Sequence, residues 1–495
     1  MSLLTFKKLF GREAAEDEIP ERLAEYFVES REFEDFDDVE ESVLFVRGKK
    51  GTGKSAVLCF YAHKLEKENE FVLTGKGTEL WHHFKPQENN PHSYVNEWQR
   101  VICTYVSMQL GKKIGIALTD DEMALVELSE LEGIKRKNIV RSLLDRFKLK
   151  LGGVESSDFL PNSNHYTLKR YIEEGEQNIW LFIDDIDQTF LNDSDSRYRL
   201  AAFFTACRYL ASSIPSLKIR AAVRDDVWWS IHREDEALDK VPQFIRTIKW
   251  DSNDTVRILA KRIEVFVSRF PKAAAFTTSK EMKKPFYAVF PYNYSWRKGQ
   301  VPSRFIIHMF ALGRPRWAIQ LGRQCLETAS RFSTVPDKIG IQLLLQTMPS
   351  YSGIKLDDLI SEYDHECPQL REIIFSFYGG GSRWTTNALK AVIGSKVISS
   401  LKISIDDNSA PKPKQVVQFL YRIGFISAFV PALKAEDEEY FRFEEKPHLL
   451  SLELNEDDGF HWAIHQTFHS ALNLSRDYKK NKEKPTKRPM SELPR

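Results

Sequence analysis

The sequence contains little cysteine and no long apolar run. Its 495 residues include five cysteines, which lie far apart and form no CxxC pair. An odd number of scattered cysteines fits neither a disulfide framework nor a zinc site, so we expect reduced, mostly buried thiols. No stretch approaches the roughly 18 apolar residues that a membrane span needs, and the basic residues 1–12 lack the apolar core of a signal peptide. These absences predict a cytoplasmic protein with no membrane partner.

A net excess of charge is also missing. Lysine and arginine together number 71 and aspartate and glutamate number 70, which excludes a uniformly basic nucleic-acid binder. The charges are nevertheless unevenly placed, because residues 13–41 hold 14 acidic and two basic side chains, whereas residues 476–495 hold eight basic and three acidic ones. Apolar side chains interrupt the acidic stretch, so we expect helix and loop packed on the next domain. The basic end predicts a disordered tail.

Short apolar runs alternate with longer helical patterns in the first half of the chain. The runs at residues 42–46, 71–73, 179–183 and 217–223 have the composition of buried strands. Residues 53–66, 95–110 and 198–212 carry apolar side chains at helical spacing. This alternation predicts an α/β fold with a parallel sheet and helical crossovers.

The pattern changes after Trp250, where we expect strands to stop except for a two-stranded wing at residues 425–429 and 440–443. The predicted helices cover residues 251–270, 303–331, 356–375, 386–393 and 414–423. A chain of this length has room for about two to four domains. We divide it into an acidic segment (1–40), an α/β core (41–250), a helical lid (251–335), a winged-helix-like domain (336–435), a C-terminal extension (436–475) and a basic tail (476–495).

One motif predicts a phosphate-binding loop. Residues 48–55 read GKKGTGKS and fit G-x-x-x-x-G-K-[ST] at every fixed position, between an apolar strand and an amphipathic helix. Backbone N–H groups of such a loop surround a phosphate, and the positive end of the helix points at it. We expect ATP and Mg²⁺ as cofactors, with Lys54 reaching the β- and γ-phosphates and the Ser55 hydroxyl on the metal. The predicted binding residues are Gly48, Lys49, Lys50, Gly51, Thr52, Gly53, Lys54, Ser55 and Ala56.

A buried strand ends in two carboxylates. Residues 178–185 read NIWLFIDD, and the first acid, Asp184, is placed to hold Mg²⁺ through a water or together with Ser55. Asp185 is a plausible base for the attacking water if the chain turns where the strand ends. Asp187 is expected to be a cap or turn residue.

Two arginines are candidates for sensing the γ-phosphate. Arg224 follows the strand at residues 217–223, and the carboxyl edge of a parallel sheet is where ligands bind. The alternative is an ion pair with Asp225 or Asp226. Arg316 belongs to the GRPR sequence at residues 313–316, which begins or interrupts a helix, and it could reach phosphate or form a surface salt bridge.

These motifs resemble bacterial STAND-like, AAA+-related P-loop ATPases, including defence-associated ones. The resemblance spans about residues 40–430 and rests on GKKGTGKSA, IWLFIDDID, AAVRDDVW, RTIKW, GRPR and the winged-helix-like end. It implies hydrolysis of ATP to ADP and phosphate, with Asp184 as the Mg²⁺ carboxylate, Asp185 as the water-activating acid, and Arg224 and Arg316 as sensors. Many AAA+ members carry glutamate at the position of Asp185. The arginine finger is open among Arg233, Arg246 and Arg257.

Two other features are open to more than one interpretation. His461, His465 and His469 recur every four residues, which predicts one face of a packed helix rather than a metal site. The winged-helix segment carries only Lys412, Lys414 and Arg422 as cations, so we favour a regulatory contact within the protein over DNA.

The sequence as a whole predicts an ATP-driven regulatory switch. By resemblance, it forms a homo-oligomer and serves anti-phage defence through self-assembly or a separate nuclease or toxin effector. The alternatives are a DNA-associated ATPase or loader that uses the winged helix, and a nucleotide-binding scaffold that does not hydrolyse ATP.

Overall fold

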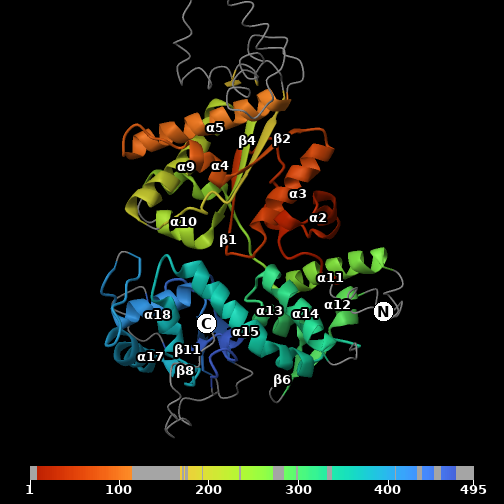
Figure 1. Ribbon diagram of the computed structural model, residues 1–495, viewed down its shortest axis with the longest axis vertical. Helices are drawn as coiled ribbons and strands as arrows, with labels where there is room; N and C mark the ends of the chain where they lie inside the picture. The colour runs from red at the N-terminus through yellow and green to blue at the C-terminus, as the bar shows by residue number, and fades with distance from the viewer. Residues whose placement is uncertain are drawn as a thin grey trace, which may run out of the picture. The chain divides into compact units, whose positions relative to one another are not determined.

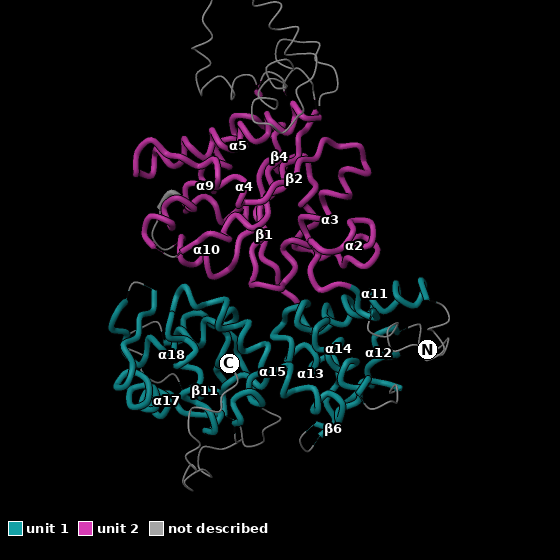
Figure 2. The backbone as a smooth tube through the Cα atoms, in the orientation of Figure 1, with its two compact units in different colours: residues 1–11, 251–495 teal, residues 12–250 magenta. Residues whose placement is uncertain are grey.

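The computed structural model divides the chain into two compact units (Figure 2). Residues 12–250 form one, the P-loop unit, and residues 1–11 and 251–495 form the other, the C-terminal unit. The structure describes residues 8–113, 168–169, 172, 177–191, 193–232, 236–270, 284–296, 299–331, 337–406, 408–431, 438–450 and 459–474. The expected basic tail, residues 476–495, lies outside the described residues. The chain crosses from one unit to the other after Gly11 and after Trp250.

The P-loop unit is built on a five-stranded sheet in the order β2-β3-β4-β1-β5 (Figure 1). Every pair of neighbouring strands in it is parallel, which confirms the predicted α/β class. Four strands match the predicted apolar runs and extend them at their carboxyl ends, and a fifth overlaps the start of the RTIKW segment. The strands are β1 (Val43–Gly48), β2 (Phe71–Lys76), β3 (Ile179–Asp184), β4 (Leu217–Arg224) and β5 (Ile245–Thr247).

Helices cover both faces of this sheet. Side chains of α5 and α9 share one apolar core with β3 and β4, whereas α3 packs with Trp180 and Phe182 in a second core on the other face. The near-continuous burial of β1, β3 and β4 follows from this double cover. The helices are α3 (Lys54–Lys67), α4 (Gly77–His83), α5 (Pro91–Lys113), α9 (Ser194–Ser213) and α10 (Asp225–His232), with short 3₁₀ turns η3 (Glu236–Lys240) and η4 (Pro242–Phe244).

The acidic N-terminal stretch packs on the sheet and on α3, as expected. It forms η1 (Ala15–Asp17), α2 (Pro20–Tyr26) and η2 (Arg31–Phe33), and Phe27 stacks on Phe60 of α3 with ring centroids 4.1 Å apart. Arg220 of β4 is fully buried and donates hydrogen bonds to the carbonyl oxygens of Phe36, Asp38 and Glu41. Burial lowers the pKa of this guanidinium to about 9. Residues 12–40 therefore belong to the P-loop unit.

The C-terminal unit begins with helices around a small hairpin. Residues 311–314 break the helix expected at 303–331, because Leu312 and Gly313 adopt positive φ angles of 51° and 69°. The elements are α11 (Ser252–Arg269), α12 (Pro285–Val289), β6 (Asn293–Trp296), β7 (Gly299–Pro302), α13 (Ser303–Phe310) and α14 (Pro315–Ser330).

A second sheet completes this unit, in the antiparallel order β10-β9-β11-β8. Together with three short helices it forms the winged-helix-like domain, and β9 and β10 are its predicted wing. The elements are α15 (Ile341–Tyr363), α16 (Leu370–Phe375), β8 (Arg383–Thr385), α17 (Thr386–Ile393), the π-helical turn η7 (Gly394–Ile398), α18 (Pro413–Arg422), β9 (Ile426–Val430), β10 (Glu439–Phe441), β11 (His461–Ile464) and η8 (Gln466–Phe468).

Three further expectations for this half of the chain are wrong. The wing was expected to hold the only strands after Trp250, but the structure also contains β6, β7, β8 and β11 there. The helix expected at residues 356–375 is the end of α15 followed by the separate α16. The histidines do not share a helical face, since His461 begins β11 and His465 caps η8. The sheet also continues past residue 435, because β10 and β11 pair with β9.

Among the described residues, no helix is both long and apolar enough to cross a membrane.

Candidate nucleotide site

The predicted loop connects the end of β1 to the start of α3. Gly51 and Gly53 have positive φ angles of 78° and 109°, a region that residues with a Cβ rarely adopt. The helix begins at Lys54, immediately after the second of these glycines. The two glycines therefore allow the tight turn that places the backbone N–H groups of the loop next to those at the N-terminus of α3.

Hydrogen bonds within the P-loop unit hold the loop in shape. Lys54 Nζ donates to the carbonyl oxygens of Gly48 at 3.0 Å and Lys49 at 3.3 Å, and Thr52 Oγ1 donates to the Lys49 carbonyl at 2.8 Å. Trp250 Nε1 donates to the Thr52 carbonyl at 2.8 Å. The ammonium group of Lys54 thus lies inside the curve of the loop, where a phosphate would meet it.

The electrostatics of the loop favour an anion. The first turn of α3 contains no acidic residue, so nothing on this helix neutralises the positive end of its dipole. Lys49, Lys50 and Lys54 add three cations within the motif. A phosphate group fits this arrangement of positive charge at the N-terminus of a helix.

The two predicted carboxylates lie where β3 ends. Asp184 is the last residue of the strand, and its carboxylate lies near the Ser55 side chain. Burial raises the pKa of Asp184 to about 6, from an ordinary 3.8, although the nearby Ser55 hydroxyl acts to lower it. Asp185 follows with a positive φ of 55°, which is uncommon for a residue with a side chain and turns the chain out of the strand. Burial, together with the charges of Glu16 and Asp187, raises the pKa of Asp185 as well.

A third carboxylate at this site was missed by sequence reasoning. Glu16 lies in η1, and its carboxylate, with those of Asp184 and Asp185, provides three oxygens within 4.8 Å of one another. The sequence showed only an acidic stretch, with nothing to distinguish Glu16 from its 13 acidic neighbours. The donor set of Ser55 and carboxylate oxygens beside a phosphate-binding loop fits Mg²⁺, which prefers oxygen ligands.

Close packing fixes the turn that carries Asp185. Gly77 begins α4, directly after β2, which pairs with β3. A Cβ on Gly77 would lie 2.2 Å from Ile186 Cα and 2.6 Å from the Asp185 carbonyl oxygen. Only glycine therefore permits this approach of the two backbones.

Arg224 ends β4, and its register partner on β1 is Gly48, the first residue of the loop motif. It pairs with Asp187, whose Oδ2 lies 3.4 Å from Arg224 Nε, more closely than with Asp226 at 3.9 Å. Asp225 pairs with Arg47 instead, at 3.0 Å. The structure thus brings Arg224 to the carboxyl edge of the sheet beside the loop, and adds Asp187, a turn residue, as its partner.

The second candidate sensor lies in the C-terminal unit. Arg316 is half-buried and is the second residue of α14. Its neighbour Arg314 is the buried member of the motif, with an ion pair of 2.5 Å between its Nη1 and Glu362 Oε2. The guanidinium of Arg314 also lies 4.6 Å from the centre of the Trp317 ring. Within the GRPR sequence, therefore, Arg314 has a structural role, and Arg316 is the more exposed arginine and the one left as the candidate sensor.

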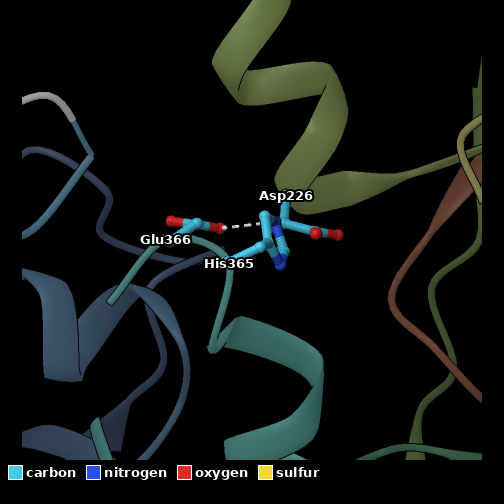
Figure 3. Close-up of side chains that lie close together, drawn as sticks. All are labelled: Asp226, His365 and Glu366. Carbon is cyan, nitrogen blue, oxygen red and sulfur yellow. Dashed lines mark ion pairs between the residues drawn. The ribbon is translucent and has the colours of Figure 1, made fainter. Parts of the chain in front are cut away.

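The other basic candidates have partners within their own units or lie outside the described residues. Arg246 pairs with Asp35, Arg257 pairs with Asp254 at 3.1 Å, and Arg233 is not among the described residues. Arg422, one of the three cations of the winged-helix segment, pairs with Glu366. The Nε2 atom of the neighbouring His365 lies 3.9 Å from Glu366 Oε1, close enough to form an ion pair when the imidazole is protonated (Figure 3).

Comparison with known proteins gives distant structural likenesses. No protein-family model matches the sequence, and no curated protein matches it. The ORC2 protein of Aeropyrum pernix, in ADPNP and ADP complexes, is 12% identical with a TM-score of 0.37, and the match covers 88% of this chain and 93% of that one. The ORC1 protein of Aeropyrum pernix, in complex with DNA, is 12% identical with a TM-score of 0.34, and the match covers 90% and 94%. DnaA from Aquifex aeolicus, bound to AMPPCP, is 11% identical with a TM-score of 0.24, covering 69% and 86%.

The fold and the site themselves define a P-loop α/β unit. In it, β4 separates β1, which carries the phosphate loop, from β3, which carries the carboxylates.

Proposed function

We propose that this chain binds ATP and hydrolyses it, and that the nucleotide state switches the arrangement of its two units. The observation that carries the proposal is that the phosphate loop and the acidic strand end lie at the same edge of the sheet, because β1 and β3 both run parallel to β4 between them. The Ser55 side chain lies near enough to Asp184 to lower its pKa. A glycine-rich loop alone would be compatible with a simple turn. A loop whose Ser or Thr hydroxyl lies beside a carboxylate at the end of a neighbouring strand is the arrangement that a nucleotide with Mg²⁺ requires.

Each part of the site has a role in this proposal. The amides at residues 48–56 and the ammonium of Lys54 bind the phosphates, and Lys54 exchanges its bonds to the loop carbonyls for bonds to phosphate oxygens. Ser55 and Asp184 are the residues that would hold Mg²⁺, which when bound neutralises developing phosphate charge. The deprotonated carboxylate is the form that serves as a ligand.

Asp185 and Arg224 are assigned to hydrolysis. Asp185 lies at the turn after the strand, and its raised pKa increases its ability to accept a proton from an attacking water. Arg224 provides a cation at the sheet edge beside the loop, where it would stabilise charge on the γ-phosphate. Arg316 of α14 is proposed as the second sensor, the residue by which the C-terminal unit responds to the nucleotide.

The wider biology of the switch is proposed from the family resemblance. A homo-oligomer that acts in anti-phage defence, by self-assembly or through a separate nuclease or toxin, fits a chain in which no further catalytic motif was found in the sequence. For the winged-helix-like domain we favour a contact within the protein over DNA. The pairing of Arg422 with Glu366 supports this, because it engages one of only three cations on the segment.

Measuring phosphate release from ATP distinguishes the proposed ATPase from the alternative, a nucleotide-binding scaffold that does not hydrolyse ATP. We expect the purified chain to release phosphate from ATP in the presence of Mg²⁺, and Asp185→Asn to lower kcat about a hundredfold or more while retaining ATP binding. Binding without phosphate release, unchanged by Asp185→Asn, would favour the non-hydrolysing scaffold. Hydrolysis that depends on duplex DNA and falls steeply with salt would favour the DNA-associated alternative.

A further inference from the structure

The chain passes twice between its two units. Residues 8–11 belong to the C-terminal unit, residues 12–250 form the P-loop unit, and the chain from residue 251 returns to the C-terminal unit. The units are therefore joined by two peptide connections, Gly11–Arg12 and Trp250–Asp251. Each connection fixes a maximum separation between the points at which it is anchored, so two of them restrict relative motion more than one.

Phe10 anchors the first connection in the C-terminal unit. Its side chain is fully buried, its ring centroid lies 6.2 Å from that of Phe290, and its carbonyl accepts a hydrogen bond of 2.6 Å from Arg262 Nη1. The ring packs directly on the backbone of α14, because a Cβ on Gly322 would lie 2.5 Å from it. Phe10 is therefore fixed to both α11 and α14.

The same connection reaches the acidic site within six residues. Glu16 lies in η1, which packs against α3, and its carboxylate lies within 4.8 Å of those of Asp184 and Asp185. A fully extended chain of six residues spans at most about 22 Å. A displacement that would carry Phe10 beyond this reach has to move η1, and with it the carboxylate of Glu16.

The second connection leads to the phosphate loop. Trp250 donates its indole hydrogen bond to Thr52 of the loop, and the next residue, Asp251, caps α11 in a capping box with Asp254. The helix α11 is thus attached to the phosphate side of the site at its start. Through Arg262 and Phe10 it is attached to the carboxylate side about 16 Å further along its axis.

We propose that residues 10–16 act as a strap and that Phe10 is a positioning residue for the carboxylates of the nucleotide site. A rotation of α11 displaces its cap at Asp251 and its contact with Phe10 at Arg262 by different amounts. The phosphate loop, connected to the first point, and the carboxylates, connected to the second, are then displaced unequally. Movement of the C-terminal unit is then transmitted to Glu16, and through it to Asp184 and Asp185. The inference rests on the proposed function for the identity of the ligand, and it adds the route by which that site is regulated.

Lengthening the strap tests this route without removing either anchor. The test variant carries a Gly-Ser-Gly-Ser-Gly insertion between Gly11 and Arg12, and the matched control carries the same insertion between Gly380 and Gly381, in the turn that precedes β8. We expect the strap insertion to lower kcat for ATP about ten- to a hundredfold, with the ATP dissociation constant within about threefold of wild type. Phe10→Ala should likewise lower kcat while leaving the ATP dissociation constant nearly unchanged. The control insertion should change neither constant.

Hydrogen exchange provides a measurement that needs no activity. Both strap variants should exchange faster than wild type at residues 15–17 and 184–187, while residues 54–67 of α3 keep their protection. Unchanged exchange at these residues together with unchanged kcat in the lengthened variant would overturn the strap. If wild type neither bound nor hydrolysed ATP, the proposed function would fail instead, and the exchange result would still decide whether the strap exists.

Discussion

Arg224 and Asp187 form an ion pair at the carboxyl edge of the five-stranded sheet. Arg224 Nη2 donates a hydrogen bond of 2.9 Å to the Asp187 carbonyl, and the backbone N–H of Arg224 donates to the Asp187 carboxylate. The side chain of Asp187 is 5% exposed and that of Arg224 is 21% exposed. Because Arg224 is the register partner of Gly48, this pair connects the turn after the acidic strand to the strand of the phosphate loop.

Replacing Arg224 should affect hydrolysis more than binding. We expect Arg224→Ala to lower kcat about a hundred- to a thousandfold, because a cation aimed at developing phosphate charge acts mainly in the transition state. The ATP dissociation constant should stay within a few-fold of wild type. Steady-state phosphate release and equilibrium binding measure the two quantities. The control is Arg22→Ala, which removes a side chain that is 51% exposed. Equal losses in binding and kcat would show that Arg224 is a structural residue only.

The pKa of Asp184 predicts a pH-dependent stability. Between the ordinary aspartate pKa of 3.8 and the value of about 6 in the folded chain, the folded state binds a proton that the unfolded state has released. The free energy of unfolding of the nucleotide-free and metal-free protein should therefore fall as pH rises through this window. Asp184→Asn removes the effect, so it should stabilise the protein by about 3 kcal/mol at pH 7 and have little effect at pH 4.

Urea unfolding at several pH values measures this difference. A variant that is equally stabilised at pH 4 and pH 7 would contradict the assignment of the shift to Asp184. Stabilisation by Mg²⁺ should show the opposite trend and increase as pH rises past 6, because binding the cation requires the deprotonated carboxylate.

Gly77 provides a test of the close contact that positions Asp185. We expect Gly77→Ala to lower the free energy of unfolding by about 2 kcal/mol, since its Cβ would meet the backbone of Ile186, and to lower kcat as Asp185 is displaced. The matched control is Gly353→Ala within α15, where an added Cβ meets nothing within 4 Å. That change should instead stabilise the protein by about 0.5–1 kcal/mol, because alanine favours the helix. Equal effects of the two substitutions would refute the steric account.

The sequence was informative where local patterns determine structure. A glycine motif between an apolar strand and a helical pattern predicts the loop, and the run ending at Asp184 predicts β3, because both depend on neighbouring residues alone. The break before α14 was predicted only in part. The GRPR sequence indicated that a helix begins or is interrupted there, but the positive φ of Leu312 is a conformation that its residue type does not favour.

Contacts between distant residues were beyond sequence reasoning. Glu16 reaches Asp184 across 168 positions, and neither its type nor its neighbours mark it among the acidic residues of its stretch. The partner of Arg224 is Asp187 rather than an adjacent aspartate, because the order of strands in the sheet places the end of β3 beside that of β4. The histidine at 461 lies in a strand because β9 and β8 pair with it on both sides, which overrides a helical spacing.

Calorimetric titration of ATP with Mg²⁺ tests the central claim most directly. The account predicts that wild type binds ATP and that Lys54→Ala weakens binding about tenfold or more, because the ammonium that contacts the phosphates is lost. The control is Lys67→Ala, at the exposed end of the same helix, which should bind like wild type. ATP binding by Lys54→Ala as tight as that of wild type would contradict the assignment of this loop as the nucleotide site.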